Sequence, residues 1–400
     1  MTQTFVVNQK PATRTPYLRG ILTRSLQKAG LPFEKAYRLA SQLRDDIADQ
    51  REISSQELRE RVIRMLEERY DASVCQRYLA NREEEKLLLI RHPDQQLTPF
   101  SRGLHQRALV AVGITAHQAR SITSRLYHRL LTQELKEISS RQLGHLTYQA
   151  ICSDLNKSTA RRYLIWTAFR HSERPLIILI GGAPGCGKST ISVELANRME
   201  IIRTQSTDML REVMRMMMPM RLAPVLHESS FNAWKALSDG TPSTSSEKIR
   251  LLANGYHAQA DLLSVPCEAV VRRALRENIS LILEGVHVSS TLLDRLPTDE
   301  SAILVPMMLA VMNAEDLRNR IHRRDGLVPR TQAERYLRHF DDIWQLQSLL
   351  LDDADKQGIP IINSTDTAAA AQEAIHIIIE ALSPEFSADA NTVFGPPDAS

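Results

Sequence analysis

A glycine-rich run near the middle of the 400-residue chain has the residue types that bind phosphate. The apolar residues 175–180 before it are typical of a buried strand, and residues 190–196 after it begin a helical pattern. Glycines at such a junction let consecutive backbone N–H groups surround phosphate oxygens, and the following helix start favours an anion. The run is Gly182-Ala183-Pro184-Gly185-Cys186-Gly187-Lys188-Ser189, and its G-x-x-x-x-G-K-S spacing predicts a phosphate-binding loop.

The same loop predicts a bound nucleotide and a metal ion. We expect Lys188 to reach the β and γ phosphates of ATP and the Ser189 hydroxyl to coordinate Mg²⁺. A second apolar run, residues 280–283, ends at Glu284, which suits the acid that holds Mg²⁺ on the strand beside such a loop. Lys188 and Glu284 are therefore candidate catalytic residues, and Ser189 and Glu284 are candidate metal ligands. The expected ATP-binding residues are Gly182, Ala183, Pro184, Gly185, Cys186, Gly187, Lys188, Ser189 and Thr190.

Residues between these two segments suit a phosphorylated acceptor. Asp208 could accept a hydroxyl proton as a catalytic and substrate-binding residue, although it could also only cap the helix that begins there. Arg211 and Arg215 lie four residues apart, so one helix face would present both cations to an anionic substrate. His287 could contact the substrate or satisfy backbone groups near the strand end.

Seven arginines crowd residues 318–338: Arg318, Arg320, Arg323, Arg324, Arg330, Arg335 and Arg338. Small-molecule kinases that have a phosphate-binding loop use a mobile arginine-bearing lid, which neutralises the transferring phosphoryl group and excludes water. We expect such a lid here, with Arg320 and Arg324 as catalytic candidates. A solvated basic helix is the alternative.

The N-terminal part of the chain contains an internal repeat. Residues 15–20 (TPYLRG) recur as residues 98–103 (TPFSRG), and after a two-residue slip residues 53–55 (ISS) recur as residues 138–140. Each copy reads as a short strand followed by four helices, and Ser54 with Glu57 forms a capping box. The repeat therefore predicts two tandem, mainly helical modules of roughly 80 residues each.

The net charge of +3 hides an uneven distribution. Residues 1–170 carry 28 basic and 17 acidic side chains, whereas residues 171–400 carry 22 and 30. Residues 98–170 alone have a net charge of +8 and could receive phosphates or an acidic partner. No nucleic-acid-binding motif accompanies this charge, so nucleic acid is not an expected partner.

The remaining composition predicts a soluble cytoplasmic protein. Its four cysteines lie far apart with no CxxC spacing, which indicates reduced thiols instead of a zinc site or a disulfide framework. The N-terminus lacks a signal-peptide pattern, and no apolar run approaches the ~20 residues of a membrane span. The oligomeric state is left open.

Over residues 172–382 the chain resembles the 2-phosphoglycerate kinase family. The resemblance rests on GGAPGCGKST, STDMLREVMR, HESSFNAWKAL, GYHAQADLL, SLILEGVHV, ERYLRHFDDIWQLQ and GIPIIN, in this order. It implies ATP-dependent phosphorylation of the 3-hydroxyl of 2-phosphoglycerate, giving 2,3-bisphosphoglycerate. The N-terminal copies, with TPFSRG, a glycine turn and RYL, resemble the ATP-cone family, a nucleotide-binding regulatory module.

These observations predict an α/β protein with a P-loop NTPase parallel sheet and flanking helices, preceded by two ATP-cone-like modules. The expected boundaries are 1–85 and 86–171 for the modules, 172–382 for the kinase domain and 383–400 for a disordered tail. Two alternatives stay open. One is a kinase for another phosphorylated acceptor, such as an inositol phosphate, and the other is a nucleotide-dependent regulatory protein.

Overall fold

The computed structural model describes residues 4–9, 12–48, 50–83, 88–133, 135–238, 240, 242–296, 302–323 and 330–396. Its contacts divide the chain into two compact units. One comprises Met1–Leu89 with Glu134–Glu137, and the other comprises Ile90–Gln133 with Ile138–Ser400.

The first unit is a three-stranded sheet with four helices. Its sheet order is β2-β1-β3, in which β1 runs antiparallel to β2 and parallel to β3. The elements are β1 (Phe5–Gln9), β2 (Ala12–Pro16), α1 (Arg19–Lys28), α2 (Phe33–Asp46), β3 (Glu52–Ser54), α3 (Ser55–Arg69) and α4 (Ala72–Glu83). The repeat analysis missed β2 and β3, because neither has an apolar alternation long enough to indicate a strand. The capping prediction at Ser54 is confirmed, since its side chain accepts a hydrogen bond from the Glu57 amide at 3.0 Å.

The second copy has the same order of elements. It contains β4 (Leu89–Arg91), β5 (Leu97–Pro99), α5 (Arg102–Val110), α6 (Ala116–Thr132), β6 (Glu137–Ser139), α7 (Ser140–Asp154) and α8 (Lys157–His171). Its sheet order, β5-β4-β6, matches that of the first copy strand for strand.

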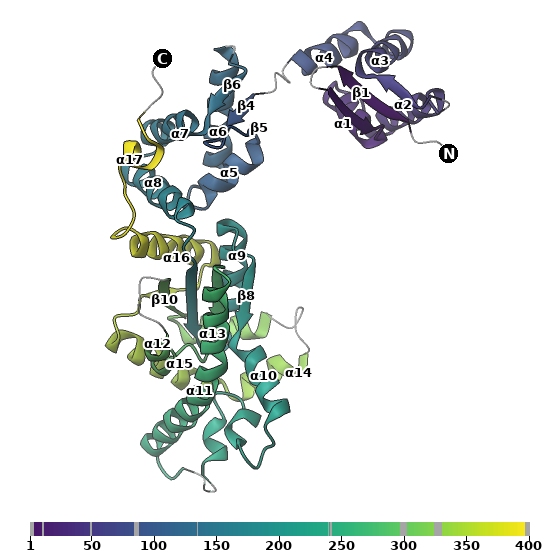
Figure 1. Ribbon diagram of the computed structural model, residues 1–400. Coiled ribbons are helices and arrows are strands. Elements are labelled where there is room, and N and C mark those ends of the chain that lie inside the picture. Colours follow the sequence, from purple (N-terminus) through teal and green to yellow (C-terminus); the bar gives the residue numbers. More distant parts are fainter. Residues whose placement is uncertain are drawn as a thin grey trace. The chain divides into compact units, whose positions relative to one another are not determined.

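The cores of the two copies differ. The first copy has its own hydrophobic cluster, which includes Leu26 and Leu66. In the second copy, Leu109 and Trp166 belong to the same cluster as residues of the C-terminal sheet and its helices. The side-chain amide of Gln372 also donates to the Gly113 carbonyl at 2.9 Å. The second copy is therefore packed onto the C-terminal part of its unit, beside α9 (Lys188–Met199) and α16 (Thr367–Leu382) (Figure 1).

A five-stranded parallel sheet forms the centre of the C-terminal region, as the sequence predicts. The strand order is β11-β10-β7-β9-β8, and every neighbouring pair is parallel. The strands are β7 (Leu176–Gly182), β8 (Arg203–Ser206), β9 (Leu281–Glu284), β10 (Ile303–Ala310) and β11 (Ile361–Asn363). Because β7 lies in the middle, its carboxyl end delivers the glycine-rich loop to the centre of one sheet edge.

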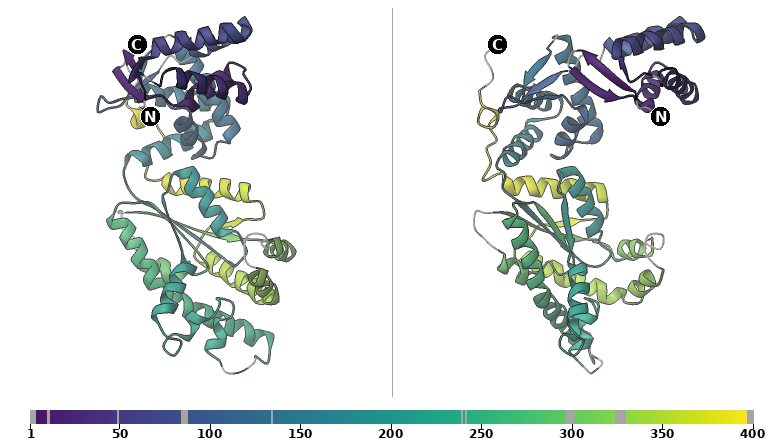
Figure 2. Two further views of the ribbon diagram at one scale, coloured as in Figure 1. Left: turned by 90° about the vertical axis from the view of Figure 1, so that its right-hand side faces the viewer. Right: turned by 45° about the vertical axis from the view of Figure 1, so that its right-hand side comes forward.

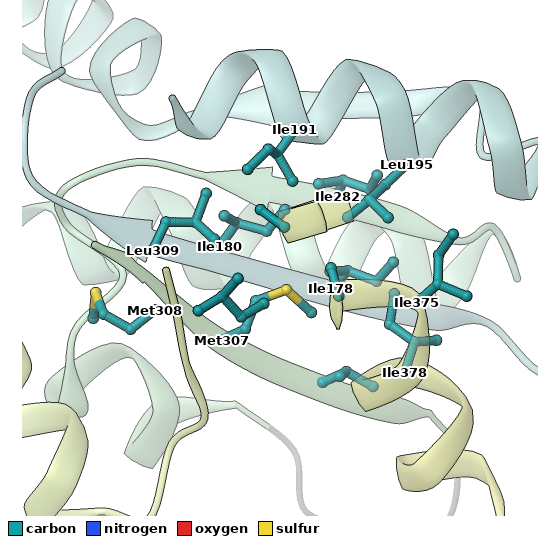
Figure 3. Packing of buried hydrophobic residues seen from close by; sticks show 14 of the residues in the cluster. Ile178, Ile180, Ile191, Leu195, Ile282, Met307, Met308, Leu309, Ile375 and Ile378 are labelled. Carbon is teal, nitrogen blue, oxygen red and sulfur yellow. The ribbon is translucent and has the colours of Figure 1, made fainter. Parts of the chain in front are cut away.

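Helices cover both faces of this sheet (Figure 2). Alternate residues of β7 face opposite sides. Ile178 and Ile180 pack with α9 and α16, as Figure 3 shows, whereas Ile177 and Leu179 share a second cluster with residues of α11. The remaining helices are α10 (Thr207–Met217), α11 (Ser245–Arg276), α12 (Ser290–Arg295), α13 (Ala314–Arg323), α14 (Arg330–Arg338), α15 (Phe340–Lys356) and α17 (Ala390–Phe394), with short 3-10 turns at Pro224–His227 and Ala233–Ala236. No helix in the described ranges combines the length and apolar character needed to cross a bilayer.

The predicted disorder of residues 383–400 is wrong for the part that the structure describes, which ends at residue 396. This segment contains α17, and Phe394 is buried with its ring 5.3 Å from that of His145 and 6.1 Å from that of Tyr163. A β-carbon on Gly144 would lie 2.4 Å from the Phe394 ring, so the glycine makes room for it. Phe386 adds a second aromatic contact, with its ring 5.7 Å from that of Phe169, so two aromatic anchors hold a segment that has no periodic apolar face.

Replacing the Phe394 anchor should loosen the C-terminal segment. We expect Phe394→Ala to cost about 1–3 kcal/mol of local stability, below the usual range for a deeply buried phenylalanine because the segment is peripheral. Hydrogen exchange of α7 and α17 amides would measure the loss. Phe33→Ala, at an exposed site in the first unit, is the control. Protection of α7 and α17 amides that stays unchanged in Phe394→Ala would contradict the packing described above.

Candidate active site

The glycine-rich loop joins the end of β7 to the start of α9. Gly185 and Gly187 have φ angles of 92° and 93°, a region that residues with a β-carbon rarely adopt. Lys188 is buried, and its Nζ donates to the Ala183 carbonyl at 3.0 Å. The lysine side chain therefore turns back onto its own loop.

Ser189 and Glu284 meet beside this loop. The Ser189 hydroxyl donates to Glu284 Oε1 at 2.8 Å, although the two residues are 95 positions apart. Glu284 ends β9, and the parallel register pairs it with Ile180 on β7. Parallel strands place their carboxyl ends at one edge, so the first turn of α9 and the end of β9 share this corner of the sheet.

Arg320 of α13 lies against the same loop from another direction. Its guanidinium donates to the Cys186 carbonyl and to Ser364 Oγ, each at 3.3 Å. Ser364 is fully buried, and its hydroxyl lies 2.6 Å from the Cys186 carbonyl. Sequence reasoning missed Ser364, although it directly follows the apolar run that includes β11, where a strand end meets the ligand-binding edge of the sheet.

The other arginines of residues 318–338 diverge. Arg318 stacks over the Phe340 ring at 4.3 Å, Arg335 donates to the Ser229 hydroxyl, and Arg338 bonds the Glu334 carbonyl on its own helix. Arg324 lies outside the described residues, as do the side chains of Arg323 and Arg330. Among the described arginines of this segment, Arg320 is the one that bonds the glycine-rich loop.

The start of α10 places Asp208 at the same sheet edge. Ser206, the last residue of β8, pairs with Glu284 in register and caps α10 by accepting from the Asp208 amide at 3.2 Å. The Asp208 side chain is exposed in the first turn. Ser206 therefore fills the capping role that was the alternative explanation for Asp208.

The two arginines of α10 are not a free pair. Glu212 lies between them, 3.4 Å from Arg211 and 2.6 Å from Arg215. Arg211 also donates to the Glu228 carbonyl at 2.6 Å, whereas its buried Nε has no hydrogen-bond partner among the described residues. Sequence reasoning missed both contacts. The position of Glu212 between the arginines depends on side-chain rotamers, and the Glu228 carbonyl is a backbone group brought in from a distant segment.

His287 is fully buried and both of its ring nitrogens are engaged by protein groups. Nδ1 lies 3.1 Å from Thr207 Oγ1, and Nε2 lies 2.8 Å from Gln259 Oε1. Both nitrogens are thus taken up by side chains and not by the backbone groups that the structural alternative named, and a contact of His287 with the substrate stays a prediction. Burial lowers the pKa of His287 to about 3, because the imidazolium would lose its hydration.

The partners of Gln259 set the direction of these bonds. Its Nε2 donates to the carbonyls of Val225 and Glu228, so its Oε1 must accept from His287 Nε2. His287 Nδ1 then accepts from the Thr207 hydroxyl. This buried chain links the residue before Asp208 to the carbonyl that holds Arg211, and so fixes the start of α10 against α11.

Two buried histidines should make stability depend on pH. Burial holds the pKa of His105 at about 4 and that of His287 at about 3, both below the ordinary 6.5. Below pH 6.5 both histidines bind a proton in the unfolded chain but stay neutral in the folded protein. The stability that their neutral form contributes is complete above pH 6.5, and the free energy of unfolding should fall as the pH falls below that value. The loss is about 1.4 kcal/mol per pH unit for each ring until its folded pKa is reached.

Denaturant unfolding at pH 7, 6 and 5 would test this slope. His287→Gln should reduce the loss between pH 6.5 and 5, even if it lowers stability at pH 7. His117→Gln, at an exposed position, is the control that should keep the wild-type slope. An unchanged slope in His287→Gln would contradict the assignment.

Comparison with known proteins identifies the family. The chain is 34% identical over 268 residues to a 2-phosphoglycerate kinase from Pyrococcus furiosus. The aligned region covers 67% of this chain and 85% of that protein. It is 34% identical over 278 residues to the Pyrococcus horikoshii 2-phosphoglycerate kinase, covering 70% and 89%. The Methanocaldococcus jannaschii 2-phosphoglycerate kinase is 33% identical over 284 residues, covering 71% and 89%.

The chain belongs to the 2-phosphoglycerate kinase family. This membership identifies it as a kinase, and the similarity spans most of the length of each relative. No model of a known protein family matches the chain.

Proposed function

We propose that this kinase transfers the γ-phosphate of ATP to the 3-hydroxyl of 2-phosphoglycerate, giving 2,3-bisphosphoglycerate, on a P-loop NTPase domain. The observation that carries the proposal is the contact of Ser189 with Glu284 beside the glycine-rich loop. The names of the relatives support the acceptor.

The loop residues fit Mg²⁺ and ATP. Ser189 Oγ and Glu284 Oε1 lie 2.8 Å apart, and Mg²⁺ prefers such hard oxygen ligands. Residues 182–190 would cradle the phosphates, and Lys188 would exchange its bond with the Ala183 carbonyl for a stronger one to phosphate. Bound Mg·ATP supplies the phosphoryl group and neutralising charge.

The acceptor would bind over the start of α10. There Asp208 would align or deprotonate the hydroxyl, while Arg211 and Arg215 hold the phosphate and carboxylate. The buried Arg211 Nε supports this role, because a buried donor without a partner is costly unless a ligand satisfies it. Arg320 would add positive charge behind the loop, and a catalytic role for Arg324 remains a proposal.

The N-terminal copies, residues 1–85 and 86–171, would be regulatory modules of the ATP-cone kind attached to the kinase domain of residues 172–382. Their shared order of elements supports a common origin. ATP-cones typically have a Lys-Arg-Asp-Gly stretch near the first strand, where this chain has Asn8-Gln9-Lys10 and Arg91-His92-Pro93-Asp94, so we assign the copies no nucleotide.

Phosphorus NMR would test the reaction directly. Mg·ATP is incubated with 2-phosphoglycerate, 3-phosphoglycerate or an inositol phosphate, and we expect a new phosphate ester with 2-phosphoglycerate. Lys188→Ala should lower kcat by about 100-fold or more, because the charge on the transferring group loses its nearest cation. ATP hydrolysis alone, with no acceptor phosphorylated, would refute the proposed phosphoryl transfer. A preference for inositol phosphates would refute 2-phosphoglycerate as the acceptor.

Arg211→Ala should act on the acceptor alone. We expect the KM for 2-phosphoglycerate to rise roughly 10- to 100-fold, the usual loss for one charge-assisted contact, while the KM for ATP stays near wild type. Arg203→Ala, which breaks an ion pair with Glu277 at the start of β8, is the matched control. Equal changes in both KM values would instead indicate a general disturbance of the site.

A further inference from the structure

A cavity of about 300 Å³ lies where the second copy meets the end of α9. Its walls come from α5, α8 and the last turn of α9 (the region is visible in Figure 1). The 12-residue helix α9 begins at Lys188 and ends at Met199, so the cavity is about 18 Å from the glycine-rich loop. It is therefore separate from the candidate active site but shares a rigid helix with it.

Three arginines from three helices converge on this cavity. Arg107 comes from α5, Arg170 from α8 and Arg198 from α9. Glu200 is the one acidic side chain of the described lining, 3.1 Å from Arg107 and 3.6 Å from Arg170. Arg198 is already paired with Glu194 at 2.6 Å, so the surplus is the one positive charge that Arg107 and Arg170 keep after sharing Glu200. The Glu200 carboxylate marks where a carboxylate or phosphate oxygen can sit.

Weak ion pairs hold the Glu200 carboxylate in this position. Its ion pairs with Arg107 and Arg170 are about half exposed, so they contribute little. A free anion could replace its carboxylate with little loss.

The cavity also has an apolar wall and room beyond the ion pairs. Its apolar members are Leu104, Ala108, Ala111, Trp166 and Met199. A second cavity of about 180 Å³ shares Trp166, Arg170, Met199 and Glu200 with the first. Arg174 borders that second space, and its buried Nε has no hydrogen-bond partner in the described part of the chain.

We propose that this cavity binds a small organic phosphate, with the phosphate on Arg107 and Arg170 and the carbon skeleton against Trp166. Arginine pairs bind phosphate oxygens through bidentate hydrogen bonds, and a phosphate would take up the positive charge that Glu200 leaves on Arg107 and Arg170. The site uses part of the +8 charge of residues 98–170, which phosphoryl transfer does not require. Because the ligand would bridge α5, α8 and α9, it would couple the second copy to the helix that carries Lys188.

Isothermal titration calorimetry at fixed salt would test the site with two probes, AMP and 3-phosphoglycerate. Both carry a phosphate, and only AMP offers a planar base to Trp166, so the pair identifies the organic part. Wild-type protein is expected to bind at least one of them. We expect the double variant Arg107→Ala/Arg170→Ala to bind that probe at least about tenfold more weakly, as expected for losing charge-assisted bonds.

Glu200→Gln separates binding from a structural role. Removing the competing carboxylate should strengthen probe binding by roughly threefold or more. If the ion pairs of Glu200 only support the fold, losing them should instead weaken probe binding in Glu200→Gln as well as in the double arginine variant. Arg125→Ala, which breaks a surface ion pair with Asp154 in the same copy, is the control and should bind as wild type does. Wild-type binding weaker than about 1 mM for both probes, or equal affinity in the double arginine variant, would overturn the proposal.

Discussion

The contact of Ser189 with Glu284 depends on the register of two parallel strands, and the rest of the site is arranged around it. Pairing Ile180 with Glu284 aligns the ends of β7 and β9, and pairing Ser206 with Glu284 aligns β8. The glycine-rich loop, the side-chain oxygens of Ser189 and Glu284, and the start of α10 therefore lie at the same edge of the sheet. A slip of one residue in either ladder would turn the Glu284 side chain to the opposite face of the sheet.

A second constraint is the need of buried polar groups for partners. Thr207, His287 and Gln259 are all fully buried, and their bonds satisfy one another and two backbone carbonyls. Such a network loses more than one bond when any member is removed, since the remaining groups stay buried without partners. It holds the α10 side of the sheet edge in place and occupies both ring nitrogens of His287.

The repeat shows how similar local sequence can enter different tertiary surroundings. Both copies have the same order of strands and helices, yet the first has a core of its own and the second shares the core of the C-terminal sheet. Neighbouring residues decide the order of elements through caps, turns and helical spacing. Partners more than a hundred residues away, such as Gln372 for Gly113, decide where the second copy packs.

The sequence by itself indicated the family and the parallel sheet and predicted the phosphate-binding loop, because each depends on short-range spacing: glycines around Lys188, an apolar run before them and a helix after. It could nominate Ser189 and Glu284 but could not place them together. The tertiary structure decided that His287 is buried with both ring nitrogens bonded to side chains, that Glu212 lies between the arginines of α10, and that Ser364 bonds the loop. These outcomes depend on side-chain burial and on contacts between distant segments, which no local pattern contains. The order of the tail was missed for the same reason, since the pocket that buries Phe394 is built by α7 and α8.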